Sequence, residues 1–178
     1  GADATTFFDV SLGQLRTNQV FLIGEVEAPG AYQISSVASA FNALHAAGGP
    51  TAIGSFRAVA VRRGGETVAT VDLYDYLLSG EVSDDVRLEQ GDVVFVPLAG
   101  PQVRMTGEVR REAIYELKQG EDIRDAIGFA GGLTAAGDGD RILIDRVIPP
   151  SERVGLTQRS VVDLRLTDLP EDSLVVMH

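Results

Sequence analysis

The chain has 178 residues and a formal net charge of −11, from 26 acidic and 15 basic side chains. It contains no cysteine, which excludes disulfides and thiolate metal sites, and no apolar run approaches the roughly 18 residues of a membrane-spanning helix. We expect no nucleic-acid partner, because phosphate binding depends on Lys and Arg, which are outnumbered here by acidic side chains. No basic n-region followed by an apolar h-region opens the chain, so we expect no signal peptide within it. We expect the chain to be an excised piece of a longer protein.

The dominant feature of the sequence is an internal duplication. Positions 19–54 recur 83 residues later, so that Gly24 falls on Gly107, and 13 of these 36 positions are identical where ordinary composition gives about 2 or 3. The repeat is a small domain, because solenoid periods run only to about 20 to 50 residues. We therefore predict a lead-in segment and two tandem domains, which occupy residues 1–18, 19–99 and 100–178.

The front half of the first domain predicts a hairpin followed by a helix. Residues 19–26 are rich in Val, Ile and Phe and predict a strand, and Pro29-Gly30 predicts a turn into a return strand at 31–34. Ser35 or Ser36 is the expected helix cap. The pair Gly48-Gly49 is expected to stop this helix.

The rear half of the first domain predicts a second hairpin, a short helix and a closing strand. Residues 57–62 and 67–71 predict strands joined by a tight turn at Gly64-Gly65. Residues 73–78 predict a short helix that Gly80 ends. The closing strand is expected at 93–96, between the Gly91-Asp92 turn and Pro97.

The second domain repeats this order with three changes. Strands are expected at 102–109 and 114–117, joined by a turn of another type because Glu112-Ala113 replaces the Pro-Gly pair, and a helix is expected at about 121–130. Arg57 and Arg62 match Arg141 and Arg146 at an offset of 84, whereas 71–73 match 162–164 at 91. The rear hairpin, 147–158, is therefore expected to be seven residues longer. No counterpart of the closing strand precedes His178, so we expect the second domain to lack it.

This order of elements predicts the α+β class, with a β-grasp arrangement of a hairpin, a helix laid across the sheet and further strands. We expect no catalytic residue, no cofactor and no metal site. His45 lies within a predicted helix without a counterpart in the repeat, and His178 is the last residue. The acidic turn 138–140 lacks the ligand spacing of an EF-hand calcium loop.

Five arginines on the rear hairpins are candidate ligand-binding residues, because a planar guanidinium can hydrogen-bond sugar hydroxyls or acidic sugars. The same side chains could instead pair with neighbouring carboxylates, as is usual in an acidic protein. These residues are Arg57, Arg62, Arg63, Arg141 and Arg146. Tyr32 and Tyr115 occupy equivalent positions, so we interpret them as packing residues rather than as a sugar platform.

The first copy carries an ordered set of motifs: Gly24-Glu25-Val26, Pro29-Gly30-Ala31-Tyr32, Ala47-Gly48-Gly49, Val71-Asp72-Leu73 and Gly91-Asp92-Val93-Val94-Phe95-Val96-Pro97. The second copy keeps most of the set but lacks the Pro-Gly pair and the closing strand. This ordered set of motifs resembles the SLBB (soluble ligand-binding β-grasp) domain.

The resemblance implies a non-enzymatic periplasmic part of a bacterial outer-membrane protein that exports capsular polysaccharide or exopolysaccharide. Its expected partners are other subunits of the export machinery, further copies of the full-length protein in a homo-oligomer, and the polysaccharide itself. Two alternatives stay open: a module that binds a soluble oligosaccharide, and an accessory domain of a redox complex. Fold alone does not decide among them.

Overall fold

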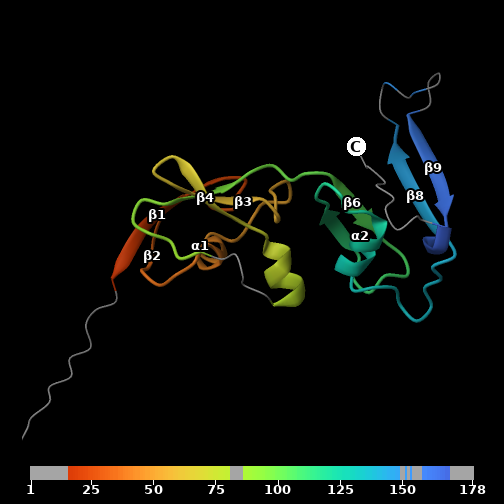
Figure 1. The fold of residues 1–178 in the computed structure, drawn as a ribbon, viewed down its shortest axis with the longest axis horizontal. Coiled ribbons are helices and arrows are strands. Elements are labelled where there is room, and N and C mark those ends of the chain that lie inside the picture. Colours follow the sequence, from red (N-terminus) through yellow and green to blue (C-terminus); the bar gives the residue numbers. More distant parts are fainter. Residues whose placement is uncertain (1–15, 81–85, 149–150, 152, 154–157, 169–178) are drawn as a thin grey trace, which may run out of the picture.

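A computed structural model describes residues 16–80, 86–148, 151, 153 and 158–168. The chain forms two units joined end to end (Figure 1), which we call module 1 (residues 16–96) and module 2 (residues 102–168). Each module has its own buried apolar cluster. The predicted α+β class with two tandem β-grasp-like modules is confirmed. Apart from residues 16–18, the predicted lead-in segment lies outside the described residues.

Module 1 is a five-stranded sheet with a helix against one face. The elements are β1 (Thr17–Gly24), β2 (Gly30–Ser35), α1 (Ala40–Ala46), β3 (Val59–Arg63), β4 (Glu66–Val71), the π-helix η1 (Asp75–Ser79) and β5 (Val93–Val96). The strands lie in the order β2-β1-β5-β3-β4, and the central β5 runs parallel to β1 and antiparallel to β3.

The core of module 1 follows from the two-residue period of its strands. Val20 and Leu22 on β1 are fully buried in the same cluster as Leu44 on α1, whereas the alternate residues Phe21 and Ile23 are 40% and 43% exposed. One sheet face therefore packs with the helix and the other faces outward.

Helix α1 starts later than predicted. Its N-cap is Ser39, whose N–H donates to the side-chain oxygen of Asn42 at 3.1 Å. Ser35 ends β2 instead, and the segment around Ser39 is held extended by a β-bridge to Arg87. The predicted caps at Ser35 and Ser36 were wrong because this tertiary pairing fixes the entry into the helix. The predicted stop is confirmed, since Gly48 has φ +86° directly after the helix.

Two strands are shorter than predicted, for local reasons. The strand predicted over 57–62 begins only at Val59, because the hydroxyl of Ser55 accepts the N–H groups of Arg57 and Ala58 and turns the chain there. The strand predicted over 102–109 ends at Met105, ahead of Gly107 with its φ of +91°.

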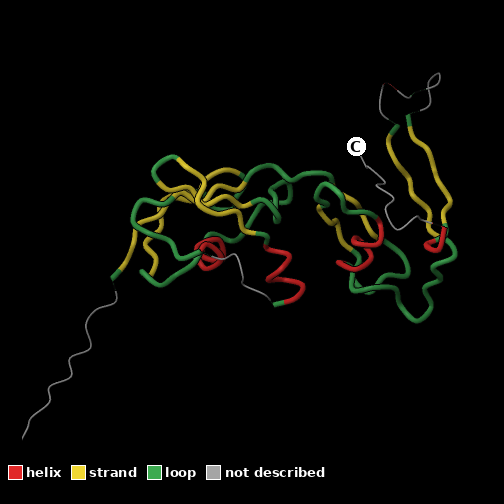
Figure 2. The backbone as a smooth tube through the Cα atoms, in the orientation of Figure 1, coloured by secondary structure: helices red, strands yellow, loops and turns green. Residues whose placement is uncertain are grey.

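Module 2 keeps the same order of elements but divides its strands between two sheets. Figure 2 shows two separate hairpins, one formed by residues 102–105 and 113–116 beside the helix of this module and the other formed by residues 142–147 and 159–164. The elements are β6 (Gln102–Met105), β7 (Ala113–Glu116), α2 (Ile123–Phe129), β8 (Ile142–Val147), β9 (Arg159–Leu164) and the 3₁₀ helix η3 (Leu166–Asp168). Within the described ranges no strand joins β6 to β8 as β5 joins β1 to β3. Residues 169–178 lie outside these ranges, so the missing closing strand stays a prediction.

Both front hairpins are closed by their tyrosine. The hydroxyl of Tyr32 donates to the carbonyl of Ala28 at 2.6 Å, and that of Tyr115 donates to the carbonyl of Arg111 at 3.0 Å. The equivalent contact exists although the Pro-Gly turn of module 1 has no counterpart in module 2. The interpretation of these tyrosines as packing residues agrees with this geometry.

The rear hairpins correspond differently from the sequence match. The N–H of Leu73 donates to the carbonyl of Phe56 at 2.7 Å, and the N–H of Leu166 donates to the carbonyl of Gly139 at 2.8 Å. These pairs equate the two modules at offsets of 83 and 93, so the second hairpin is ten residues longer rather than seven. Burial fixes this register, because a slip of one residue would turn every side chain to the other face.

The new register changes which residues of module 2 correspond to Arg57 and Asp72 of module 1. Arg57 corresponds to Asp140, and Asp72 corresponds to Arg165. The sequence match of Arg57 with Arg141 was therefore wrong, because it aligned like residues across a loop of unequal length.

Candidate functional site

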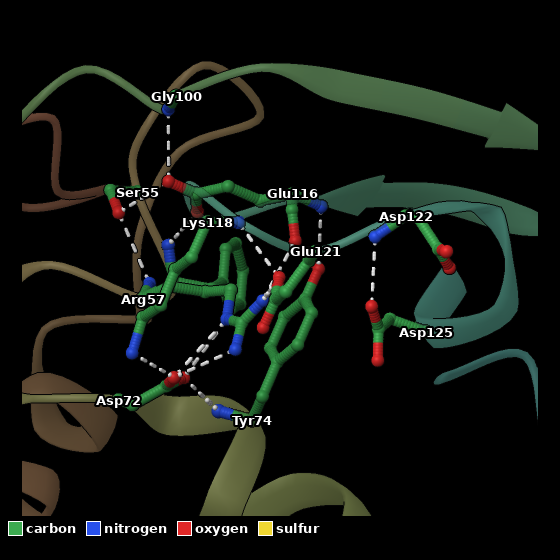
Figure 3. Close-up of polar contacts among 11 residues, drawn as sticks. Ser55, Arg57, Asp72, Tyr74, Gly100, Glu116, Lys118, Glu121, Asp122 and Asp125 are labelled. Carbon is green, nitrogen blue, oxygen red and sulfur yellow. Dashed lines mark hydrogen bonds and ion pairs between the residues drawn. The ribbon is translucent and has the colours of Figure 1, made fainter. Parts of the chain in front are cut away.

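Arg57 lies at the junction of the two modules and binds both of them (Figure 3). Its side chain is only 7% exposed. Within module 1, Nε and Nη2 each donate to Oδ2 of Asp72 at 3.1 Å. Toward module 2, Nη1 donates to the carbonyl of Glu116 at 3.3 Å and to the carboxylate of Glu121. This arginine therefore holds a carboxylate from each module.

Two aromatic rings enclose the same guanidinium. Its central carbon lies 4.7 Å from the ring centroid of Tyr74 and 4.9 Å from that of Phe129. These two rings meet edge to face at 5.2 Å. Tyr74 is the N-cap of η1 in module 1, and Phe129 belongs to α2 in module 2, so the cation–π contacts also cross the junction.

Glu116, on β7, fixes the linker and the turn that precedes β3. Its Oε1 accepts from the hydroxyl of Ser55 at 2.8 Å and from the N–H of Gly100 at 2.9 Å, and its Oε2 accepts from the N–H of Phe56 at 2.9 Å. The N–H of Glu116 in turn donates to the hydroxyl of Tyr74 at 2.8 Å. A single buried carboxylate thus satisfies donors from module 1 and from the linker.

Asp72 receives a second cation from module 2. Lys118 Nζ lies 2.6 Å from Oδ2 of Asp72, beside the two nitrogens of Arg57. Burial raises the pKa of Asp72, but hydrogen bonds from Lys118, Arg57 and the N–H of Tyr74 lower it by more, so its pKa lies below the usual value. The Arg57 pKa is raised, because its bonds to Glu121 and Asp72 outweigh the effect of burial.

The lowered pKa predicts that acid weakens the junction. A carboxyl group whose folded pKa is depressed contributes its full stability above the unfolded pKa of about 3.9 and loses it as the pH falls through the folded value. We expect the free energy of unfolding, measured by urea titration, to fall below about pH 4. The Asp72→Asn variant should be less stable at neutral pH, and the difference from the wild type should shrink as the pH falls below the ordinary carboxyl pKa of about 3.9.

Asp145 provides a matched control for this titration, since its ion pair with Arg159 is exposed. The Asp145→Asn variant should follow the wild-type acid profile. A D72N profile parallel to that of the wild type throughout would contradict the assignment of the acid response to the junction.

The other candidate arginines lie apart from Arg57. Arg63 donates to both oxygens of Asp92 at 2.9 and 2.8 Å, and Arg62 lies 4.8 Å from the ring centroid of Phe95. Asp92 is fully buried, and its pKa is lowered chiefly by the hydrogen bond from Arg63. The pair Arg63–Asp92 thus fixes the turn that leads into β5.

The two arginines of module 2 lie on its exposed rear hairpin. Arg141 Nε lies 3.6 Å from Oδ2 of Asp163, and Arg146 Nε donates to the hydroxyl of Ser160 at 3.4 Å. The five candidates therefore do not form one ligand site. Arg57 is enclosed by protein groups, whereas Arg62 and Arg141 face outward.

Sequence reasoning missed the carboxylates and rings that complete the junction. Their signal lies in departures from the repeat rather than in the repeat itself, because the equivalent positions of module 1 carry neither a carboxylate nor an aromatic ring. Glu116, Glu121 and Phe129 stand where module 1 has Gln33, Ala38 and Ala46. A difference between copies at one face indicates that only one copy uses that face.

The contacts around Arg57 hold the two modules together. Within the described residues there is no group of three or more His, Cys, Asp or Glu side chains placed to hold a metal ion. The part of the chain that the structure describes contains no helix with the length and apolarity needed to cross a membrane. At the acidic turn, the N–H of Asp140 donates to the side chain of Asp138 at 2.9 Å.

Comparison with known families gives two matches in tandem. Residues 18–96 match one family model of the SLBB domain, and residues 102–157 match another. The two matched segments coincide with the sheet of module 1 and with the front and middle of module 2. The five residues between them form the linker that contacts Glu116 through Gly100.

Proposed function

Because the chain belongs to the SLBB domain family and carries two of its modules in tandem, we propose that it is a structural part of a bacterial polysaccharide export protein. In this role it acts in the periplasm as a scaffold or wall segment beside the outer membrane, without catalysis of its own. The resemblance of tandem SLBB modules to such export proteins supports the proposal.

The observation that carries the proposal is the junction around Arg57. A buried arginine held by two carboxylates and two aromatic rings costs desolvation, and it stabilises only one relative placement of the modules. A pair of domains fixed end to end is suited to a wall or a spacer. Two domains that close on a ligand would instead require freedom at this point.

The test is an export assay in a strain whose surface polysaccharide depends on the full-length protein. The K118A/E121A variant removes two junction contacts from side chains that are 48% and 21% exposed, so both cores stay intact. We expect most of the surface polysaccharide to be lost at an unchanged protein level, whereas the Arg62→Ala control should export normally. Normal export by a variant whose junction is shown by hydrogen exchange to be open would overturn the proposal.

The alternative of an oligosaccharide-binding module can be addressed on the outward sheet face of module 1. There Phe21 is 40% exposed and Arg62 lies over the ring of Phe95. The test is calorimetric titration with oligosaccharides from the capsule of the bacterium that makes this protein. Saturable binding that is lost in the R62A variant would favour this alternative. The scaffold role expects no such binding.

A further inference from the structure

The junction consists of two complementary parts. The receiving surface belongs to module 1, and the inserting face belongs to module 2. The receiving surface comprises Ser55, Arg57, Asp72 and Tyr74, and the inserting face comprises Glu116, Lys118, Glu121 and Phe129. The receiving surface has two central charges. Its cation, Arg57, pairs with Glu121 of the inserting face, and its anion, Asp72, pairs with Lys118 of the inserting face.

Module 2 repeats the backbone of this receiving surface with the two central charges inverted, whereas Asp138 and Thr167 stand at the positions of Ser55 and Tyr74. The hydrogen bond from Leu166 to Gly139 repeats that from Leu73 to Phe56, which places Asp140 at the position of Arg57 and Arg165 at that of Asp72. Both side chains are exposed. Among the ion pairs of the described residues, none involves Asp140 or Arg165.

The inverted surface is also hollowed. An open pocket of about 390 Å³ lies there. Its lining consists of Asp140, Arg141, Asp163, Leu164 and Arg165. In module 1 the equivalent charges are covered by the neighbouring module, which leaves the Arg57 and Asp72 side chains 7% and 8% exposed.

We propose that this surface of module 2 receives a further SLBB module, joined end to end as module 2 is joined to module 1. The charges specify the incoming module. Where module 2 has Lys118 the newcomer carries a carboxylate that pairs with Arg165, and where module 2 has Glu121 it carries a cation that pairs with Asp140. The inference is independent of polysaccharide export, because it concerns the order of modules in any tandem array.

The inversion also excludes this chain's own modules from the surface. A second copy of module 2 would bring Lys118 against Arg165 and Glu121 against Asp140, which sets like charges face to face. A second copy of module 1 would offer uncharged Ser35 and Ala38 at these two positions. Attraction and repulsion together make the order of modules specific and prevent open head-to-tail chains of one protein.

The experiment compares two fusion chains of identical composition. Each fusion chain runs to Val176 and continues with a second copy of residues 89–178. This copy supplies a further β5 strand, a further 97–101 linker and a further inserting face. One fusion keeps the copied Lys118 and Glu121, and the other exchanges them (K118E/E121K in the copy only). We expect the exchanged fusion to dock, with cleavage of the copied linker by a protease slowed at least about tenfold relative to the unexchanged fusion.

A reversal in the receiving surface provides the control. Adding D140R/R165D to both fusions should invert the result, so that the unexchanged copy now docks and its linker becomes the protected one. The proposal is overturned if the two original fusions are cleaved equally, or if the reversal leaves their order unchanged.

A second measurement covers the case in which the copied module does not fold, which circular dichroism would reveal. In the two-module chain, R57D/D72R converts the receiving surface of module 1 into the type found on module 2. Protease cleavage of the 97–101 linker should rise at least about tenfold in this variant and should return to the wild-type rate when K118E/E121K is added. Failure of this rescue would also overturn the proposal.

Discussion

Replacing Arg57 by alanine should lower the free energy of unfolding by about 3 to 5 kcal/mol, as expected when one partner of a buried ion pair is removed. The loss arises because Asp72 stays buried with Lys118 as its remaining cation, while the carbonyl of Glu116 loses its donor. The rings of Tyr74 and Phe129 also lose the group between them. Urea titration followed by circular dichroism measures the effect.

Arg62 is the matched control for this variant, since it lies five residues further along the same segment. Its side chain is exposed and its described contact is the ring of Phe95. We expect Arg62→Ala to cost no more than about 1 kcal/mol. Equal losses in the two variants, or an R57A loss within about 1 kcal/mol, would show that the junction contributes little to stability. Arg57→Lys should recover only part of the loss, because lysine lacks the planar fork.

The second large effect is expected at Gly24, where alanine should cost about 4 kcal/mol or more. An added Cβ would lie 2.1 Å from the carbonyl oxygen of Val96 and 2.9 Å from the ring of Phe95, both on β5. The residue also has φ +86°, which L side chains rarely adopt. Relief would require β5 to move away from β1 and open the centre of the sheet.

The duplication supplies the control for Gly24 within the same molecule. Gly107 occupies the equivalent position with φ +91°, yet an added Cβ there meets no described atom within 4 Å. Gly107→Ala should therefore show only the backbone cost of about 1 to 2 kcal/mol. Thermal and urea unfolding of the two variants measure the difference. Equal costs would mean that the approach of β5 is not what makes Gly24 necessary.

The front half of each module could be predicted because its signals are local. Turn residues, a helix stop and strand alternation lie within about a dozen positions of one another, and the repeat supplied each of them twice. Gly48 has the positive φ expected of a helix stop. Where a distant segment intervenes, the local signal failed: the pairing of Ser39 with Arg87 displaced the cap from Ser35 and Ser36.

The junction could not be predicted from residue spacing. The groups around Arg57 lie 15, 59 and 64 positions away along the chain, and nothing in a single sequence orders such pairs. The equivalence of Arg57 with Arg141 failed for a related reason. Identity between residues guided the alignment, whereas burial of Ile144 and the pairing of β8 with β9 set the register in the fold.

The position of β5 also has a consequence for how module 1 folds. This strand is central in the sheet but is the last of the five strands of module 1 along the chain, and it pairs Val93 with Phe21 from β1. Each of the hairpins β1–β2 and β3–β4 pairs residues that are close in the sequence. The two hairpins become one sheet only when β5 inserts between β1 and β3, which requires the chain from β1 to β5 to close into a loop. Until β5 arrives, the inner edges of both hairpins are unpaired, and this is the stage at which the nascent module is most open to misassociation.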